Sequence, residues 1–331
     1  MEYRNIGSLR TSVLGIGGLH FGTLCDQAAA TRIVHRALDA GVNFIDTAPL
    51  YGNGYSEGFI GNAIRGRRHD VVVATKVGLE PSKAKDGSFG VSVIPLSKKN
   101  ILSSIEKSLR ALGTDYIDLY QVHAFDSGIP IEDTMATLDG LVQEGKIRCI
   151  GCSNYLRGEL GKATAAIRKG GASFVSFQAH YNLIERRAEQ EVLPDCLKYG
   201  VGIICNRPLA RGILTGKYKT GQLLPQGSRA VTSYRIRRWL SESTLLLVTA
   251  LEELAQRHGR TVAEMAIAWL LAQRGISVVL AGARNLQQLE VNIRATGWIL
   301  SNEDLAEVDV VIEKMNLMPQ VKAMPETLFE K

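Results

Sequence analysis

The sequence has few cysteines, no signal-like start and no long apolar run, and each of these absences narrows the class of protein. Its 331 residues include only five cysteines, an odd and sparse set that is not typical of a disulfide framework. The first ten residues, MEYRNIGSLR, lack the apolar core of a secretory signal. No run approaches the roughly 18 apolar residues of a membrane span. We therefore expect a cytoplasmic protein in a reducing compartment, with no membrane partner.

A concentrated block of one charge is also lacking. Lys and Arg number 39 and Asp and Glu 33, and the basic residues are spread along the chain. No zinc-finger, helix-turn-helix or aromatic RNA-binding signature accompanies them, so we expect no nucleic-acid partner and favour a small anionic ligand. With 45% hydrophobic and 22% charged residues, the composition is that of a globular chain able to bury a large core.

Short β-branched runs alternate with helix-period segments along the whole chain. The runs predicted as strands are 12–18, 42–48, 70–76, 116–123, 147–153, 174–178, 201–206 and 277–282. The helix-period segments between and after them are 27–40, 56–65, 98–112, 131–144, 156–168, 188–199, 261–273 and 285–294. Eight strands each followed by a helix favour a (β/α)8 TIM barrel over a doubly wound open sheet, and we expect residues 1–331 to form one domain.

Three segments exceed this repeat. The helical patterns at 242–258 and 302–316 predict two additional helices outside the barrel. The segment 217–241 is polar, basic and irregular, and we expect a mobile flap over the C-terminal mouth of the barrel.

Polar side chains stand at or just after the ends of several predicted strands. Asp46 closes one strand, Tyr51 follows in the next loop, Lys76 closes another strand and His123 a third. The C-terminal ends of barrel strands open into one mouth, where this fold places its active sites. A single Asp or Lys at a strand end is more often a structural group, but four titratable residues that converge favour a catalytic site.

Each of these residue types has a chemical task. A tyrosine with its usual pKa of about 10 is a poor acid at neutral pH, and a neighbouring ammonium lowers this pKa by stabilising the phenolate. Lys76 would supply the ammonium, and Asp46 would keep it charged and in place. His123 would orient a substrate carbonyl while Tyr51 protonates its oxygen.

The sequence resembles the aldo-keto reductases over essentially its whole length. The resemblance lies in six motifs in order, GVNFIDTAPLYGNGYSEGFIG, ATKVG, DYIDLYQVH, GKIRCIGCSN, PLARGILTGKY and AGARNLQQLEVNI. It implies a barrel enzyme that transfers hydride between a nicotinamide cofactor and a carbonyl, and it places the family's catalytic tetrad on the same four residues, Asp46, Tyr51, Lys76 and His123.

The resemblance also implies the cofactor contacts. Three positions would hydrogen-bond the nicotinamide carboxamide, namely Ser153, Asn154 and Gln178. The pyrophosphate cradle would comprise Gly212, Leu214, Gly216 and Lys217. The adenosine end would comprise Gly282, Ala283, Arg284, Gln288 and Asn292. Because Arg284 can grip a 2′-phosphate and 282–289 holds no acidic residue, we expect NADPH rather than NADH.

Some positions depart from the family pattern. Asn206 and Arg207 stand where the family often has an aromatic residue followed by Ser, and Val291 stands where it often has Glu. Cys149 and Cys152 form a C-x-x-C, but they fall within a predicted strand, where this offset directs their side chains to opposite faces. We therefore expect neither a redox pair nor a metal site.

The expected activity is reduction of an aldehyde or ketone, with Phe21, Tyr51, His123 and Trp239 contacting the substrate. Two alternatives stay open: a sugar (aldose) dehydrogenase working in the oxidative direction, and a cofactor-sensing regulatory subunit of a channel-type complex.

Overall fold

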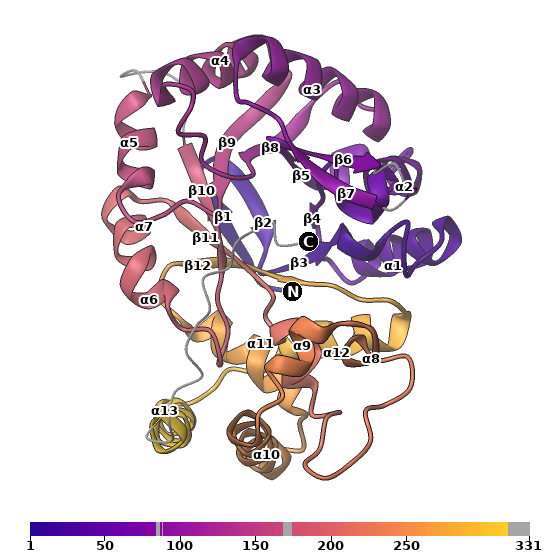
Figure 1. Cartoon of the computed structure of the whole chain (residues 1–331), viewed down its shortest axis with the longest axis vertical. Helices are drawn as coiled ribbons and strands as arrows, with labels where there is room; N and C mark the ends of the chain where they lie inside the picture. The colour runs from indigo at the N-terminus through magenta and orange to yellow at the C-terminus, as the bar shows by residue number, and fades with distance from the viewer. Residues whose placement is uncertain (84–86, 88, 168–173, 317–331) are drawn as a thin grey trace.

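The computed structural model describes residues 1–83, 87, 89–167 and 174–316. Residue 168 of the expected helix 156–168 and residues 317–331 of the expected domain lie outside these ranges. Within them, eight parallel strands close into one barrel, in the order β10-β11-β12-β3-β4-β5-β8-β9 (Figure 1). The strands are β3 (Leu14–Gly17), β4 (Phe44–Asp46), β5 (Val72–Val77), β8 (Ile117–Val122), β9 (Ile147–Ser153), β10 (Phe174–His180), β11 (Gly202–Asn206) and β12 (Ile276–Ala281). Each overlaps a strand expected from the sequence, so the predicted (β/α)8 barrel is confirmed.

Helices surround the barrel and connect its strands (Figure 1). They are α1 (Gln27–Asp39), α2 (Ser56–Ala63), α3 (Lys98–Leu112), α4 (Ile131–Gln143), α5 (Glu159–Ala166), α6 (Ala188–Glu191), α7 (Leu193–Tyr199), α11 (Val262–Ala272) and α12 (Leu286–Ala295). The segment 188–199, expected as one helix, is two, because the chain leaves helical geometry at Val192 and Pro194 lies in the first turn of α7.

Side-chain caps and a glycine mark several helix ends. Ser97 Oγ accepts a hydrogen bond from the backbone N–H of Asn100 at 3.4 Å, and α3 ends at Gly113 in the left-handed region with φ 62°. At α11, the Thr261 hydroxyl accepts from the Glu264 N–H while the Glu264 carboxylate accepts from the Thr261 N–H, which is a capping box.

The two additional helices are also present. They are α10 (Glu242–Arg257) and α13 (Asn302–Asn316), and Figure 1 shows both outside the ring of strands. The expected flap segment is less irregular than the sequence indicated, because it contains the short helices α8 (Arg229–Thr232) and α9 (Tyr234–Arg238). Its mobility stays a prediction.

Two antiparallel hairpins were missed by the sequence analysis. The first is β1 (Tyr3–Ile6) with β2 (Leu9–Ser12), and the second is β6 (Leu79–Lys83) with β7 (Phe89–Val93). Ile6 and Leu9 of the first hairpin pack into the apolar cluster inside the barrel, beside residues from the strands. Its turn needs Gly7, because φ there is +57° and an added Cβ would lie 2.3 Å from Val175. The hairpin therefore closes the end of the barrel opposite the mouth.

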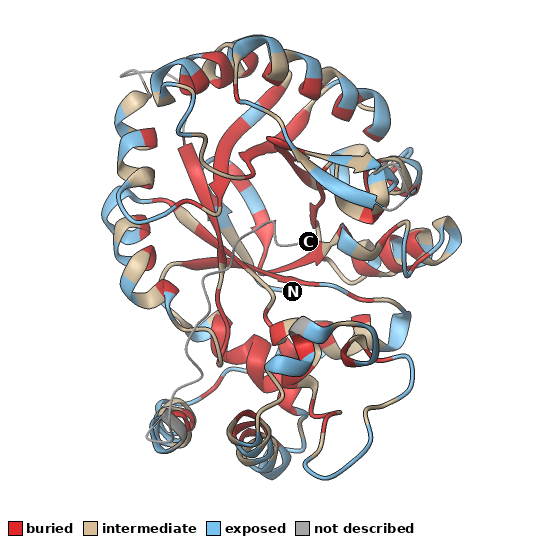
Figure 2. Ribbon diagram, viewed as in Figure 1, coloured by how far each residue is buried: buried red, intermediate tan, exposed pale blue. Residues whose placement is uncertain are grey.

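The barrel strands and the inward faces of the helices are buried, while the outer helix faces are exposed (Figure 2). On β9, Cys149 belongs to the cluster inside the barrel and Cys152 to the cluster between strands and helices. The two thiols therefore lie on opposite faces of the strand, as expected. Among the described residues, no helix has both the length and the apolar character needed to cross a bilayer.

Candidate active site

Asp46, Lys76 and Tyr51 form one hydrogen-bonded chain at the carboxyl ends of β4 and β5. The Lys76 ammonium donates to Asp46 Oδ2 at 2.7 Å and Oδ1 at 2.9 Å, to the Thr47 carbonyl at 2.8 Å, and lies 3.2 Å from Tyr51 Oη. Lys76 has no exposed surface and Asp46 is 2% exposed. A buried charge is tolerated only when it is paired and hydrogen-bonded, and Lys76 meets this condition through oxygen atoms alone.

The loop after β4 brings Tyr51 over Lys76 because it is unusually tight. Gly52, the next residue, has φ +58°, and a Cβ there would lie 1.6 Å from the Phe21 carbonyl oxygen. Only glycine allows the two backbone segments to approach this closely. The chain therefore passes against the first loop of the barrel, and the Tyr51 ring lies 4.6 Å from the Lys76 ammonium.

His123 follows β8 directly and faces the tyrosine. Its ring makes an edge contact with the Tyr51 ring at a centroid distance of 6.0 Å. Burial, the Lys76 charge and His180 hold the pKa of His123 well below its usual range, so the imidazole is neutral. Its Nδ1 is buried with no hydrogen-bond partner among the described residues. A neutral ring of this kind can hydrogen-bond a substrate oxygen without changing the charge of the site.

The acidity of Tyr51 differs from the expectation. Burial raises the pKa of Tyr51, and the opposite effect of Lys76 does not overcome it. The expected net lowering of this pKa is therefore wrong for the protein alone, since the sequence does not reveal that the hydroxyl is so deeply buried. Burial also works against the charge of Lys76, but Asp46 and Tyr51 outweigh it and raise the pKa of Lys76. At neutral pH the site thus holds an ammonium beside a protonated phenol, the state that a proton donor needs.

A row of amide side chains continues from Asp46 across the barrel. Gln121 and Gln178 both donate to Asp46 Oδ1, at 3.1 and 2.8 Å, and Asn206 donates to Gln178 Oε1 at 3.1 Å. Gln121 was not among the site residues expected from the sequence. Its position could have indicated the role: Gln121 lies two residues before His123, and alternate residues of a strand share a face. These amides add hydrogen bonds to Asp46 Oδ1, the oxygen that Lys76 also binds.

The three residues expected at the nicotinamide are also at strand ends, and all three already make bonds within the protein. Ser153 Oγ donates to the Gln178 carbonyl at 3.2 Å, and Asn154 Nδ2 donates to the His123 carbonyl at 2.9 Å. The amide nitrogen of Gln178 is bound to Asp46. The structure therefore brings these residues to the mouth, and their contacts with a cofactor stay a prediction.

The expected pyrophosphate cradle lies in a distorted turn after β11, η4 (Ala210–Thr215). Gly212 has φ +97°, and a Cβ there would lie 3.1 Å from the Lys217 ammonium. Gly216 ends the turn with φ +73°, and Leu214 is fully buried beneath it. The turn thus presents backbone and the Lys217 charge rather than bulky side chains, which suits a phosphate group.

The expected adenosine end is the start of α12. The Arg284 N–H donates to Gln288 Oε1 at 2.9 Å, and Asn285 caps the helix. Gly282 is exposed and the Ala283 side chain is buried. Asn292 is 2% exposed, and its Nδ2 has no hydrogen-bond partner among the described residues. An unpaired buried donor at this place fits a ligand with acceptor atoms, such as an adenine ring.

Three cations, Lys217, Arg229 and Arg284, form a cluster across these two regions, and the sequence indicated a role for Lys217 and Arg284 only. Burial, with Arg229 and Arg284 nearby, lowers the pKa of His20 to about 4. Burial and the same two arginines lower the pKa of Lys217, and burial with Arg207 and Arg284 lowers that of Arg229. Beside Arg229, the buried Ser228 hydroxyl has no partner among the described residues. Cations that repel one another around an unpaired hydroxyl fit a ligand with several negative charges.

Two residues expected to contact the substrate are buried or partly buried. Phe21 is completely buried, which weighs against direct contact with a substrate. Trp239 follows α9 and is partly buried against the main core. Both assignments stay predictions.

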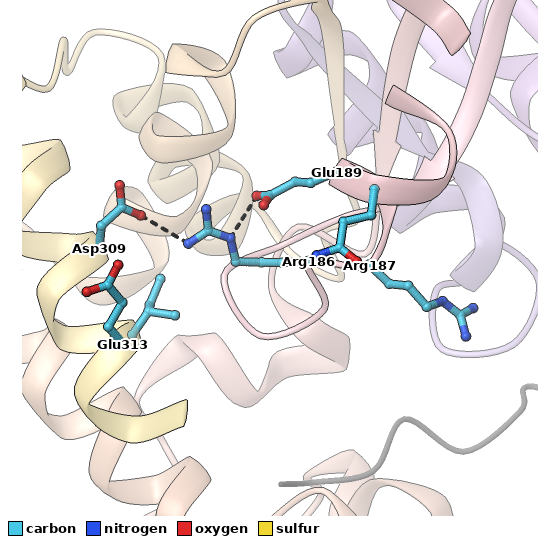
Figure 3. Close-up of a pocket in the computed structure, with 7 residues that line it drawn as sticks. Arg186, Arg187, Glu189, Asp309 and Glu313 are labelled. Atoms are coloured by element: carbon cyan, nitrogen blue, oxygen red, sulfur yellow. Dashed lines mark hydrogen bonds and ion pairs between the residues drawn. The ribbon is translucent and has the colours of Figure 1, made fainter. Parts of the chain in front are cut away.

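A separate pocket lies between α13 and the chain around α6 (Figure 3). Arg186 bridges Glu189 at 2.7 Å and Asp309 at 3.0 Å across it. None of its lining residues belongs to the polar chain or to the cation cluster described above. The ion pairs fasten α13 to the barrel, and we assign no ligand to this pocket.

Comparison with known proteins points to one family. The protein-family model described as "Aldo/keto reductase family" matches residues 13–313 of this chain. An L-glyceraldehyde 3-phosphate reductase of Escherichia coli (strain K12) is 33% identical, with 93% of this chain and 92% of that protein covered. A probable voltage-gated potassium channel subunit beta of Oryza sativa subsp. japonica is 33% identical, with 95% and 97% covered. The solved structure of a glycerol dehydrogenase from Gluconobacter oxydans matches with a TM-score of 0.84 and 29% identity, covering 96% of this chain and 97% of that one.

Proposed function

The chain belongs to the aldo/keto reductase family, a family of NAD(P)H-dependent oxidoreductases, and from this premise we propose that it reduces an aldehyde or ketone to an alcohol with NADPH. Tyr51 is the proton donor. The observation that carries the proposal is the buried chain from Asp46 through Lys76 to Tyr51, which ends on a phenol beside a neutral imidazole.

Bound NADPH would supply the hydride that reaches the carbonyl carbon. The carbonyl oxygen would lie between Tyr51 and His123, where the imidazole donates a hydrogen bond and the tyrosine gives up its proton. Lys76 stabilises the phenolate that this transfer leaves behind, and Asp46 keeps Lys76 charged. The burial of these side chains strengthens their electrostatic effect, because little water competes with it.

The preference for NADPH is supported by the cation cluster. Arg284 lies at the start of α12 and Arg229 approaches it from α8. A 2′-phosphate adds about two negative charges, and it would relieve the repulsion between these cations, whereas the hydroxyl of NADH would not. We also propose that Ser228 and Arg229 belong to the cofactor site.

The two alternatives each have a relative in their favour. The glycerol dehydrogenase supports the oxidative direction, and the channel subunit from Oryza sativa supports a regulatory role. The same polar chain serves oxidation in reverse, with Tyr51 as the proton acceptor. Reduction is our first choice because the matched relative from Escherichia coli is named a reductase.

The proposal is tested by steady-state assays with a panel of aldehydes, ketones, aldoses and polyols, in both directions and with both cofactors. We expect turnover of carbonyl compounds with NADPH, and a higher kcat/KM for NADPH than for NADH. Faster turnover of polyols or aldoses with the oxidised cofactor would favour the dehydrogenase alternative. Tight NADPH binding without turnover of any carbonyl would favour the regulatory one.

A further inference from the structure

A row of hydrogen-bonded side chains runs from the rim of the barrel to the buried carboxylate of Asp46. It begins at His180, the last residue of β10, which is the register partner of Asn206, the last residue of β11. His180 Nδ1 is hydrogen-bonded to Asn206 Oδ1, Asn206 Nδ2 to Gln178 Oε1, and Gln178 Nε2 to Asp46 Oδ1. Neither His180 nor Asn206 has a role in the tetrad.

The direction of each bond in this row is fixed by the residue at its inner end. A carboxylate only accepts, so Gln178 must direct its NH2 group toward Asp46. Its carbonyl then faces Asn206, which must direct its own NH2 group toward Gln178. The Asn206 carbonyl is left for His180, whose Nδ1 must therefore carry a hydrogen. All the dipoles in the row point the same way, and such aligned bonds strengthen one another.

We propose that His180 and Asn206 are positioning residues for the proton donor. Through Gln178 they hold the Asp46 carboxylate in the orientation that keeps Lys76 against Tyr51. This inference rests on the proposed function of Tyr51, and it adds two residues that touch none of the reacting atoms. It also gives Asn206 a role at a position where the aldo-keto reductases often have an aromatic residue.

The expected effect on chemistry follows from the charges around Asp46. Without the aligned row, the carboxylate loses part of its hydrogen bonding and attracts Lys76 more strongly. Lys76 then stabilises the Tyr51 phenolate less, and the tyrosine loses its proton only at higher pH. Alcohol oxidation needs the phenolate as proton acceptor, so its rise with pH should move upward. The titratable or charged groups that face this system are Asp46, Tyr51, Glu57, Lys76, His123, His180 and Arg207.

Matched substitutions separate this role from a merely structural one. His180→Leu removes the donor to Asn206, whereas His180→Asn keeps an N–H donor on the atom bonded to Cγ, as Nδ1 is in His180. Asn206→Leu breaks the row. Asn206→Asp has nearly the same shape but sets an oxygen against Gln178 Oε1, so Gln178 must turn its NH2 group away from Asp46. We expect Asn206→Asp to be the most damaging of the four variants.

The experiment measures kcat against pH for alcohol oxidation, together with the Kd for NADPH from fluorescence, in the four variants, the wild type and Tyr51→Phe. For His180→Leu and Asn206→Leu we expect kcat at pH 7 to fall about 2- to 10-fold, and the rise with pH to move up by roughly 0.3 to 1 unit, the size of one hydrogen bond between neutral groups. His180→Asn should keep the wild-type profile, and the Kd for NADPH should stay unchanged in all of them.

The proposal is overturned if both Leu variants keep the wild-type pH profile while Tyr51→Phe is inactive. It is also overturned if His180→Asn shifts the profile as far as His180→Leu, or if Asn206→Asp is less affected than Asn206→Leu. An active Tyr51→Phe variant would instead refute the proposed function itself, and this outcome is distinct from the other three.

Discussion

Removing the Lys76 charge should destabilise the fold as well as stop turnover. The Lys76 ammonium has no exposed surface, and it binds both Asp46 oxygens and the Thr47 carbonyl. Lys76→Met keeps most of the side-chain volume but leaves the Asp46 carboxylate buried without its cation. Breaking a buried pair in this way costs about 3–5 kcal/mol, because the remaining charge is uncompensated.

The matched control is the double variant Asp46→Asn/Lys76→Met, which has no buried charge at this place. Gln121 and Gln178 can still donate to the amide oxygen of the new side chain, as they do to Asp46 Oδ1. We therefore expect the double variant to regain more than half of the lost free energy of unfolding, although it stays inactive.

The assay is urea unfolding at pH 7, followed by tryptophan fluorescence and circular dichroism. A Lys76→Met variant within about 1 kcal/mol of the wild type would show that the pair does not stabilise the fold. A double variant no more stable than Lys76→Met would show that the loss comes from packing rather than from the uncompensated carboxylate.

Two further predictions concern the cofactor and His123. Arg284→Ala should lower kcat/KM for NADPH about 10- to 150-fold, the worth of charged hydrogen bonds, with little change for NADH. Steady-state assays with both cofactors at fixed ionic strength measure these kcat/KM values. An equal loss for NADPH and NADH would show that Arg284 does not bind the 2′-phosphate. Because burial, Lys76 and His180 hold the pKa of His123 well below its usual range, its ring should stay neutral between about pH 6 and 8. An NMR titration of the histidine rings measures this. If His123 gains a proton in this interval, its ring is not buried beside Lys76 as the structure shows.

The barrel was predictable because its signals are local. Alternating β-branched runs and helical periods mark each unit, and caps such as Ser97 and Thr261 mark helix ends. The hairpin β1-β2 was missed because its strands are short. In addition, Ile6 and Leu9 are buried only because they pack against the barrel interior, and the local sequence does not show this contact. The break between α6 and α7 carried a signal, Pro194, that the periodic pattern concealed.

The candidate site was predictable where residues follow strand ends, and less so where it depends on three-dimensional surroundings. Asp46, Lys76 and His123 were found from their places in the pattern. The raised pKa of Tyr51 was not, because burial of the hydroxyl depends on the close approach of Gly52 to Phe21. The sequence did not indicate Ser228 and Arg229 as part of the proposed cofactor site, because only folding brings α8 beside the start of α12.

The central claim is that Tyr51 supplies the proton, and the most direct test is a single-turnover measurement of hydride transfer. Tyr51→Phe and the wild type are each mixed with NADPH and a carbonyl substrate from the panel, and the loss of NADPH absorbance is followed at pH 7. We predict that Tyr51→Phe binds NADPH with the wild-type Kd but transfers hydride roughly 10²- to 10⁴-fold more slowly, the usual contribution of general acid catalysis. A variant that keeps more than half of the wild-type rate would contradict the account.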